Sequence, residues 1–421
     1  MPHRVVIVGG GFAGLYAARN FAGTPVSVWL VDRRNFHLFQ PLLYQVATGA
    51  LSPGEVASPL RYVLRRARNV DVLMATVTGL DVANRRVILD TGVLEYDDLL
   101  LASGSTDHYF SHPEWEALAP SLKTIEHATE IRSRVLLAFE NAERETDPET
   151  RRAYLSFVIV GGGATGVELA GALAEIANDT LRHDFRHIDP TTAQIQLVEG
   201  ADRVLPTFPS DLSAKAEKQL HQLGVRTRAG ARVTSITPEG VTVSKSGRDE
   251  FIPARTVLWA AGVQASPLGR MIADQTGVPI DRAGKLIVGP DLTVPGHPEI
   301  HIAGDLASYS HQTGAPLPGV APVAMQQGKY VAKQICARLK GRTLPPFRYF
   351  DKGNLATIGR NKAVGVIRGL HLSGFPAWFV WVFVHLMYLV EFDNRLLVFV
   401  EWVYNYITRN RGARLITGEK K

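Results

Sequence analysis

Glycines with one repeated spacing are the residues in this sequence best suited to chemistry. The spacing G-x-G-x-x-G occurs twice: at Gly9, Gly11 and Gly14, and again at Gly161, Gly163 and Gly166. In such a turn one glycine permits the bend, one lets the backbone reach a pyrophosphate, and one lets helix and strand pack closely. Both stretches are therefore candidate dinucleotide-binding sites.

The elements around the first turn fit a βαβ unit that binds FAD. An apolar strand is predicted over 4–8, a helix over about 13–21, and a second strand over 26–31 that ends at Asp32. A carboxylate at that point accepts hydrogen bonds from the hydroxyls of a ribose. The alternative is a glycine-rich loop without a ligand. The candidate FAD-binding residues here are Gly9, Gly11, Phe12, Ala13, Gly14, Asp32 and Arg33.

The second turn predicts a site for NADH. A strand over 155–160 precedes it, and a helix over about 165–181 and a strand over 195–198 follow, the last ending at Glu199. The polar stretch 182–190 is interpreted as a helix extension and a surface loop. A carboxylate repels the 2′-phosphate of NADPH, although the nearby Arg203 weakens that preference. The candidate NADH-binding residues are Gly161, Gly163, Thr165, Gly166 and Glu199.

Composition narrows the class of protein. A chain of 421 residues is expected to form two or three domains. Its single cysteine, Cys336, excludes both an internal disulfide and a redox-active dithiol, and it indicates a reducing compartment. Electrons must then pass directly between cofactors and substrate. The net charge of +6 is accompanied by no recognisable nucleic-acid module.

Five further stretches complete a resemblance to a known family. They are 35–49 (NFHLFQPLLYQVATG), 163–171 (GATGVELAG), 259–263 (WAAGV), 302–305 (IAGD) and 324–328 (AMQQG). In this order they resemble the two-dinucleotide-binding-domain flavoproteins, and among them the type II NADH dehydrogenases, which are single-subunit NADH:quinone oxidoreductases. The resemblance implies further cofactor-binding residues at Ser103, Gly104, Gly304, Asp305 and Ala324 for FAD, and at Gly262 for NADH. Asp305 is expected at the start of a helix, where its alternative role is an N-cap.

The resemblance also implies catalytic residues. Glu168 matches a glutamate that faces nicotinamide and flavin and assists proton movement; alternatively it interacts only with the helix dipole. Gln326 and Gln327 match positions near the quinone, although they could instead pack against the flavin, and Pro322 stands where a glutamine is common. Lys352 matches a family lysine near that site, and its alternative is surface solvation.

The last part of the chain has a different composition. Residues 377–390 contain no Asp, Glu, Lys or Arg, but the run is shorter than the ~20 residues that a membrane span needs. Aromatic and basic residues surround it: Trp378, Trp381, Trp402, Arg409, Arg411 and Arg414. Amphipathic helices lying on the membrane are therefore predicted, with dimerisation or packing on the FAD domain as alternatives.

These observations predict an α/β protein with two Rossmann-like domains, one for FAD and one for NAD, and a C-terminal amphipathic helical region that anchors it to the membrane. The FAD domain is expected over 1–112 and 293–345, the NAD domain over 113–292, and the membrane-association and dimerisation region over 346–421. No metal site is predicted. The expected protein is a homodimer on the cytoplasmic face of the cell membrane that reduces ubiquinone or menaquinone without pumping protons.

Two other functions stay open at this point. One is a soluble NAD(P)H-dependent reductase for a protein acceptor, and the other is a non-enzymatic flavin redox sensor. A sulfide:quinone reductase has a related fold but needs cysteines that this chain lacks. Fold alone does not choose among these functions.

Overall fold

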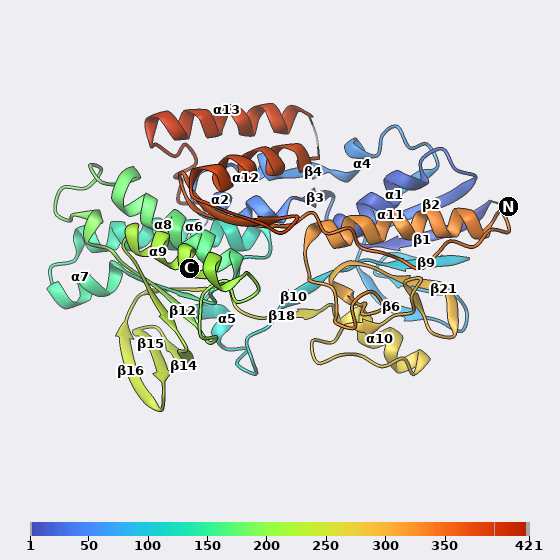
Figure 1. The fold of residues 1–421 in the computed structure, drawn as a ribbon, viewed down its shortest axis with the longest axis horizontal. Coiled ribbons are helices and arrows are strands. Elements are labelled where there is room, and N and C mark those ends of the chain that lie inside the picture. The colour runs from blue at the N-terminus through green and yellow to red at the C-terminus, as the bar shows by residue number, and fades with distance from the viewer. Residues whose placement is uncertain (1, 391, 418–421) are drawn as a thin grey trace. The chain divides into compact units, whose positions relative to one another are not determined.

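A computed structural model describes residues 2–390 and 392–417 (Figure 1). The chain forms two compact units. Unit 1 consists of the described residues within 1–38, 57–106 and 263–351, and unit 2 of those within 39–56, 107–262 and 352–421. The domains expected from the sequence divide the chain by cofactor, and their bounds stay a prediction.

Unit 1 is built on a six-stranded sheet in the order β20-β21-β9-β1-β2-β5. Its central strand β1 (His3–Val8) pairs in parallel with β2 (Val26–Asp32) and with β9 (Asp98–Leu101). The end of β1 is buried on both faces, as the unbroken apolar sequence requires. The other strands are β5 (Val70–Met74), β20 (Thr293–Val294) and β21 (His297–Ile302).

Two helices of unit 1 lie against each other. Helix α1 (Phe12–Phe21) follows β1, and α11 (Ala321–Arg338) packs on it. A Cβ on Gly328 would overlap the carbonyl oxygen of Ala13, so only glycine permits this close approach. The remaining elements of unit 1 are β3 (Phe36–Leu38), β4 (Ala57–Pro59), α4 (Leu60–Val63), the antiparallel sheet β6 (Val77–Asp81), β7 (Arg86–Leu89) and β8 (Gly92–Glu95), β10 (Ser105–Asp107), β18 (Val263–Ala265), α10 (Pro267–Thr276), β19 (Leu286–Ile287), a 3₁₀ turn (Gly304–Leu306) and β22 (Ala307–Ser308).

Unit 2 repeats the parallel core with fewer strands. Its sheet has the order β13-β12-β11-β17, where β11 (Ser156–Val160) lies between β12 (Gln194–Glu199) and β17 (Thr256–Trp259). Helix α8 (Ala164–Glu175) follows β11 and continues into a π-helical turn at Ile176–Thr180. The other elements near this sheet are α5 (Trp115–Leu118), α6 (Ile125–Arg144), α7 (Pro148–Tyr154), a 3₁₀ turn (Pro190–Thr192), α9 (Ser210–Gln222), β13 (Val225–Ala229) and the antiparallel sheet β14 (Arg232–Thr237), β15 (Gly240–Lys245) and β16 (Arg248–Pro253).

The C-terminal part of unit 2 begins with a three-stranded antiparallel sheet. Its strands are β23 (Asn354–Gly359), β24 (Lys362–Ile367) and β25 (Leu370–Ser373), and β23 packs directly on α8. Helices α12 (Phe375–Tyr388) and α13 (Phe392–Thr408) follow and lie side by side (Figure 1). Residues 39–56 add a 3₁₀ turn (Gln40–Leu42), α2 (Leu43–Ala47) and α3 (Pro53–Val56). No helix in the described part of the chain has both the length and the apolarity to cross a bilayer.

Two local predictions need correction. Asp305 does not begin a full helix: it lies in a single 3₁₀ turn, and strand β22 follows at once. The stretch 182–190 is loop rather than helix extension, because α8 ends at Glu175 and one π turn closes it. The carboxylate of Glu143 on α6 fixes this loop by accepting the backbone N–H groups of Arg186, His187 and Ile188.

Candidate active site

The first glycine-rich turn is held by the backbone of unit 1. Gly9 has a φ of 106° and donates its N–H to the carbonyl of Val31 at 2.8 Å. A Cβ on Gly14 would overlap the oxygen of Gly9, so the third glycine lets α1 begin directly beneath the turn. Gly11 is the N-cap residue of α1, and around it there is open space where a Cβ would be. A pyrophosphate needs that space to reach the helix N-terminus.

Asp32 lies at the end of β2, as the sequence predicts. Its two carboxylate oxygens accept the N–H of Gly10 at 2.6 Å and of Arg34 at 2.8 Å. The carboxylate is therefore fixed beside the glycine turn, where a ribose would meet it. The neighbouring Arg33 is exposed.

Two buried polar atoms of unit 1 test whether these residues fit FAD. His37 is 1% exposed and its Nδ1 bonds the carbonyl oxygen of Gly10 at 2.9 Å, but its Nε2 has no partner in the described chain. Its ring also meets that of Phe12 edge-on. The buried hydroxyl of Ser103 likewise has no partner among the described residues. Such atoms are costly unless a ligand satisfies them, so the residues present fit a polar cofactor at this turn.

The charge state of His37 follows from its burial. Desolvation lowers the pKa of His37 to about 4, against the opposing effect of its bond to Gly10, and the positive charge of Arg19 lowers it further. The imidazole is therefore neutral at physiological pH. With Nδ1 donating to the Gly10 carbonyl, Nε2 is a hydrogen-bond acceptor.

Three predicted FAD-binding residues from distant parts of the sequence meet in unit 1. Gly304 has a φ of 75°, and a Cβ there would lie 3.6 Å from the Cβ atoms of both Ala13 and Ala324. Asp305, next to it, accepts a hydrogen bond from the hydroxyl of Ser105 at 2.6 Å. Gly104 immediately precedes β10, the strand that begins at Ser105, and has a φ of 69°. The start of α1, the start of α11 and the 3₁₀ turn thus form one cluster.

The two glutamines of α11 already have partners inside unit 1. Gln327 is buried and its Oε1 accepts the N–H of Gly304 at 2.7 Å. Gln326 makes two bonds to the backbone of Phe350, at 2.9 and 3.0 Å. Pro322 lies in the first turn of the helix, where its missing N–H leaves no bond unmade. Gln327 therefore shapes the cofactor cluster, and Gln326 ties α11 to the segment before Lys352.

The second turn in unit 2 repeats this geometry. Gly161 has a φ of 107° and donates its N–H to Val198 at 2.8 Å, and a Cβ on Gly166 would overlap the Gly161 oxygen. Glu199 accepts the N–H groups of Gly162 at 2.5 Å and Ala201 at 2.7 Å. Gly163 is the N-cap residue of α8, and around it there is open space. Thr165, in the first turn, is exposed. Gly262 has a φ of 72°, and its carbonyl accepts the N–H of His108.

Glu168 lies on α8, on the side that packs against β23. It is half-buried, and desolvation raises its pKa to about 8, although a hydrogen bond from the Thr357 backbone opposes this shift. The carboxyl is therefore largely protonated at neutral pH. Lys352, also in unit 2, is exposed and donates to the hydroxyl of Tyr388 at 2.5 Å.

Sequence reasoning missed a second group of buried polar residues in unit 2. Tyr44 and Gln45 lie on α2, and Trp402 on α13 donates its indole N–H to Gln45 at 2.7 Å. These residues stand far apart in the sequence and follow no spacing rule. Their one available signal was that Tyr44 and Gln45 fall inside the family-like stretch 35–49.

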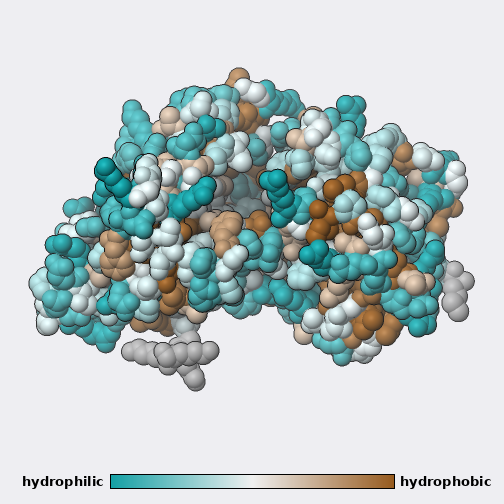
Figure 2. All heavy atoms as spheres, turned by 90° about the horizontal axis from the view of Figure 1, so that it is seen from below, coloured by the Kyte–Doolittle hydropathy of each residue, from teal (hydrophilic) through white to brown (hydrophobic). Residues whose placement is uncertain are grey.

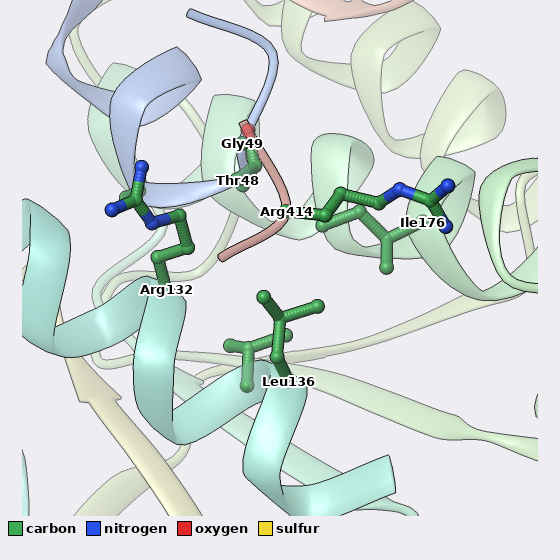
Figure 3. A pocket seen from close by; sticks show the side chains of 8 residues that line it. Thr48, Gly49, Arg132, Leu136, Ile176 and Arg414 are labelled. Carbon is green, nitrogen blue, oxygen red and sulfur yellow. The ribbon is translucent and has the colours of Figure 1, made fainter. Parts of the chain in front are cut away.

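A small hollow elsewhere in unit 2 contains none of the predicted site residues. Arg132 and Leu136 rise from α6 toward Thr48, Gly49 and the tail residue Arg414 (Figure 3). Arg132 is buried, which lowers its pKa, and its Nε has no partner in the part of the chain that the structure describes. Arg414 is neutralised by an ion pair with Asp184. The hollow is thus separate from the residues that serve the nucleotide turns.

Comparisons with known proteins agree with this geometry. The family model of the pyridine nucleotide-disulphide oxidoreductases matches residues 3–328, and that of the NDH2 C-terminal domain matches residues 352–410. A type II NADH:quinone oxidoreductase of Mycobacterium tuberculosis is 44% identical over 99% of this chain and 91% of the relative. A demethylphylloquinone reductase of Synechocystis is 30% identical over 95% of each chain.

A solved structure supports the fold independently. NDH2 from Plasmodium falciparum, in complex with NADH, has a TM-score of 0.89 to this chain, with 19% identity over 99% of this chain and 100% of that one. The match to the family models, the identity over nearly the whole chain and the two glycine turns lead to one conclusion. The chain belongs to the type II NADH:quinone oxidoreductases, within the pyridine nucleotide-disulphide oxidoreductase family.

Proposed function

We propose that this protein oxidises NADH and reduces a membrane quinone, with FAD as its bound cofactor. The observation that carries this proposal is the pair of matching glycine turns in a chain 44% identical to a type II NADH:quinone oxidoreductase. In each turn an acid accepts the N–H of the glycine after the first one, Gly10 or Gly162. Bound FAD would supply the redox chemistry, hydride acceptance from NADH and transfer of two electrons to the quinone. The protein supplies position and electrostatics. No redox-active dithiol takes part, because Cys336 is the single cysteine.

Each turn has residues that would hold its nucleotide. In unit 1 these are the glycines of the turn, Asp32 at the ribose, and the cluster of Ala13, Gly304 and Ala324. In unit 2 the glycines hold the pyrophosphate of NADH, while Glu199 accepts from its ribose and disfavours a 2′-phosphate. The guanidinium of Arg203 donates a hydrogen bond to the carbonyl of Pro206, so it is not wholly available to a nucleotide phosphate.

Glu168 is the residue that we assign to proton supply. Its carboxyl holds a proton at neutral pH, and quinone reduction consumes two protons for each two electrons. Lys352 stays a candidate on the quinone side. Gln326 and Gln327 are candidates of a weaker kind, because their amides are engaged with Phe350 and Gly304.

The tail supports a proposal of membrane attachment. Residues spaced four apart along α12 form one exposed apolar stripe: Phe375, Phe379, Phe383 and Met387. Helix α13 adds a second exposed set: Leu396, Leu397, Phe399, Val400, Val403 and Ile407. Exposed apolar side chains of this density on adjacent helices fit burial in the lipid interface. On the face drawn in Figure 2, hydrophilic residues predominate and hydrophobic ones lie in separate groups.

One part of the predicted lipid contact is wrong. Arg411 is only 8% exposed and pairs with Glu175 at 3.0 Å, so it is not available to an anionic lipid. Arg409 and Arg414 also form ion pairs, with Asp179 and Asp184. Attachment therefore rests on the apolar stripes more than on the basic residues. We further infer a homodimer on the cytoplasmic face of the cell membrane, where NADH is available and a lone thiol stays reduced.

The test uses full-length holoenzyme and vesicles containing a long-tailed quinone. NADH oxidation should require the quinone, and the protein should float with the vesicles. Replacing Phe379 and Phe383 by Ser should release the protein while NADH oxidation with a water-soluble quinone continues. NADH oxidation that ignores quinone would overturn the assignment, and flotation of the double variant would overturn the attachment surface.

A further inference from the structure

Tyr44, Gln45 and Trp402 form a chain of hydrogen bonds that joins α2 to the C-terminal tail of unit 2. Gln45 donates its Nε2–H to the hydroxyl oxygen of Tyr44 at 2.9 Å, and its Oε1 accepts the indole N–H of Trp402 at 2.7 Å. Tyr44 is 7% exposed and Gln45 is 8% exposed. Asn405, one turn further along α13, donates to the carbonyl of Ala50 at 3.1 Å. The tail helix is thus fixed at two points, to α2 through Gln45 and to the loop after α2 through Ala50.

The chemistry of these groups leaves one arrangement of donors and acceptors. An indole N–H can only donate, so the oxygen of the Gln45 amide must face Trp402 and its nitrogen must face Tyr44. The Tyr44 oxygen then receives a hydrogen bond, and its own O–H proton has no acceptor among the residues that the structure describes. Tyr44 is therefore a buried donor whose orientation is set by Gln45 and whose acceptor comes from elsewhere.

The surroundings of Tyr44 point to the kind of acceptor. Helix α2 packs on α8, and the charged groups that act on the Tyr44 hydroxyl are Glu168, Glu175 and Arg411, with Glu168 the strongest. Burial raises the pKa of Tyr44 well above 10, the carboxylates of Glu168 and Glu175 raise it further, and Arg411 opposes the shift, so the hydroxyl keeps its proton. Trp381 of α12 meets the Tyr44 ring at 6.5 Å, and its buried indole N–H also has no acceptor in the described chain. A buried hydroxyl donor without an acceptor, on a helix that packs against the one carrying Glu168, fits an oxygen that gains negative charge.

We propose that Tyr44 donates a hydrogen bond to the quinone oxygen that Glu168 protonates, and that Gln45 and Trp402 are positioning residues for the Tyr44 hydroxyl. This inference rests on the proposed role of Glu168. The two electrons come from NADH through the bound cofactor. As this quinone oxygen gains charge, the O–H bond of Glu168 breaks and one O–H bond of the quinol forms. The proton for the second quinone oxygen, and the proton that restores Glu168, come from solvent water. Tyr44 keeps its proton throughout and stabilises the charge, as donors in an oxyanion hole do.

The test compares two electron acceptors in Tyr44→Phe holoenzyme. Quinone takes up electrons and protons, whereas ferricyanide takes up electrons alone. We expect Tyr44→Phe to lower kcat with a water-soluble quinone by roughly 10- to 100-fold, since it removes one donor to a developing charge. The rate with ferricyanide and the KM for NADH should stay within about twofold, because hydride transfer needs no Tyr44 donor. An equal loss with both acceptors, or no loss with quinone, would overturn the proposal.

Two further variants test whether Gln45 and Trp402 position the Tyr44 hydroxyl. Gln45→Glu preserves the shape and can still accept from Trp402, but it has no N–H for Tyr44 and draws the hydroxyl proton to itself. It should reproduce the quinone-specific loss of Tyr44→Phe. Trp402→Phe should give a smaller loss of the same kind, and Trp378→Phe is its matched control, because Trp378 packs on Tyr406 and not on Gln45. Unchanged quinone kinetics in Gln45→Glu would refute the positioning role.

The variant Glu168→Gln separates the role of Tyr44 from the role of Glu168 on which it rests. A quinone-specific loss in Glu168→Gln together with normal Tyr44→Phe kinetics would leave the Glu168 assignment standing and reject the role of Tyr44. Normal quinone kinetics in Glu168→Gln would reject proton supply by Glu168, and the Tyr44 proposal would fall with it. A quinone-specific loss in both variants supports both.

Discussion

The glycine-rich turns of the two units have nearly the same backbone geometry and hydrogen bonds. The φ of the first glycine is 106° in unit 1 and 107° in unit 2, and each donates its N–H at 2.8 Å to the strand that ends in the acid. In each, the acid accepts the N–H of the next glycine along: Asp32 from Gly10 at 2.6 Å, and Glu199 from Gly162 at 2.5 Å. The backbone requirements of a pyrophosphate therefore fix both turns, whichever nucleotide each one binds.

The turns differ in what surrounds them. In unit 1 the carbonyl of Gly10 accepts a hydrogen bond from the imidazole of His37, whose Nε2 has no partner among the described residues. In unit 2 the carbonyl of Gly162 accepts the backbone N–H of Leu205. Helix α1 packs on another helix, while α8 packs on β23, where the carbonyl of Ile358 leaves room only for Gly171 and where Glu168 lies. In the proposed assignment the shared motif binds a nucleotide in each unit, and the side chains around it distinguish the turn for FAD from the turn for NADH.

The largest expected effects come from substituting the third glycine of each turn separately. Gly14→Val should abolish FAD retention and with it all activity, because its side chain overlaps the Gly9 oxygen. Gly166→Val should keep FAD but lose reduction by NADH by more than roughly 100-fold, the loss expected when binding and orientation both fail. Flavin absorbance of the purified proteins and its bleaching by NADH measure both effects. Loss of flavin from Gly166→Val would show that the units are not independent in binding.

A second prediction concerns Glu168 on α8, because α1, the matching helix of unit 1, contains no acidic residue. Because its raised pKa lies at about 8, the carboxyl holds its proton below that pH and loses it above. Quinone reduction should therefore fall as the pH rises through about 8. Glu168→Gln should lower the rate roughly 100-fold, as removal of a general acid does, and remove this fall. The pH profile of kcat is the measurement, and an unchanged alkaline limb in the variant would contradict the assignment.

A third prediction separates the two acids. Glu199→Gln keeps an acceptor for the ribose but removes the charge that repels a 2′-phosphate. The ratio of kcat/KM for NADPH over NADH should rise by roughly 10-fold, which corresponds to about 1.4 kcal/mol. Asp32→Asn, the matched change in unit 1, should weaken FAD retention and leave that ratio unaltered. A ratio unchanged in Glu199→Gln would mean that Glu199 does not read the phosphate.

The smallest expected effect concerns His37. Its folded-state pKa of about 4 lies below the ordinary value of 6.5, so neutral His37 stabilises the fold above pH 6.5. That stability is lost as the pH falls from 6.5 toward 4, since the unfolded chain takes up the proton first. His37→Gln should lose flavin affinity several-fold at pH 7 and show a shallower loss of Tm over this interval. Thermal unfolding followed by flavin fluorescence checks both, and an identical pH slope in the variant would exclude His37 as the cause.

The sequence predicts the parallel cores well because their signals are local. The glycine spacing, the apolar strands β1 and β11, and the terminal acids Asp32 and Glu199 each lie within a short βαβ unit. The antiparallel sheets β6–β8, β14–β16 and β23–β25 carry no such motif, and they went unpredicted. Asp305 was expected to begin a helix because residues 302–305 resemble a family motif, but strand β22 follows after a single turn.

The unpredicted part of the site depends on contacts between distant residues. Trp402 donates a hydrogen bond to Gln45, although most of the sequence separates the two residues. Gln327 on α11 accepts the backbone N–H of Gly304, which lies in the 3₁₀ turn. Nothing in residue type or spacing distinguishes these side chains from their neighbours. The pKa of Glu168 is likewise a property of its burial between α8 and β23, which the helix sequence alone does not reveal.

The most direct test of the central claim is an anaerobic stopped-flow experiment on the holoenzyme, with flavin absorbance followed through two mixing steps. NADH in the first step should bleach the flavin, and a water-soluble quinone in the second should restore it at a rate that accounts for steady-state turnover. A flavin that NADH bleaches but quinone leaves reduced would contradict the assignment of quinone as the electron acceptor.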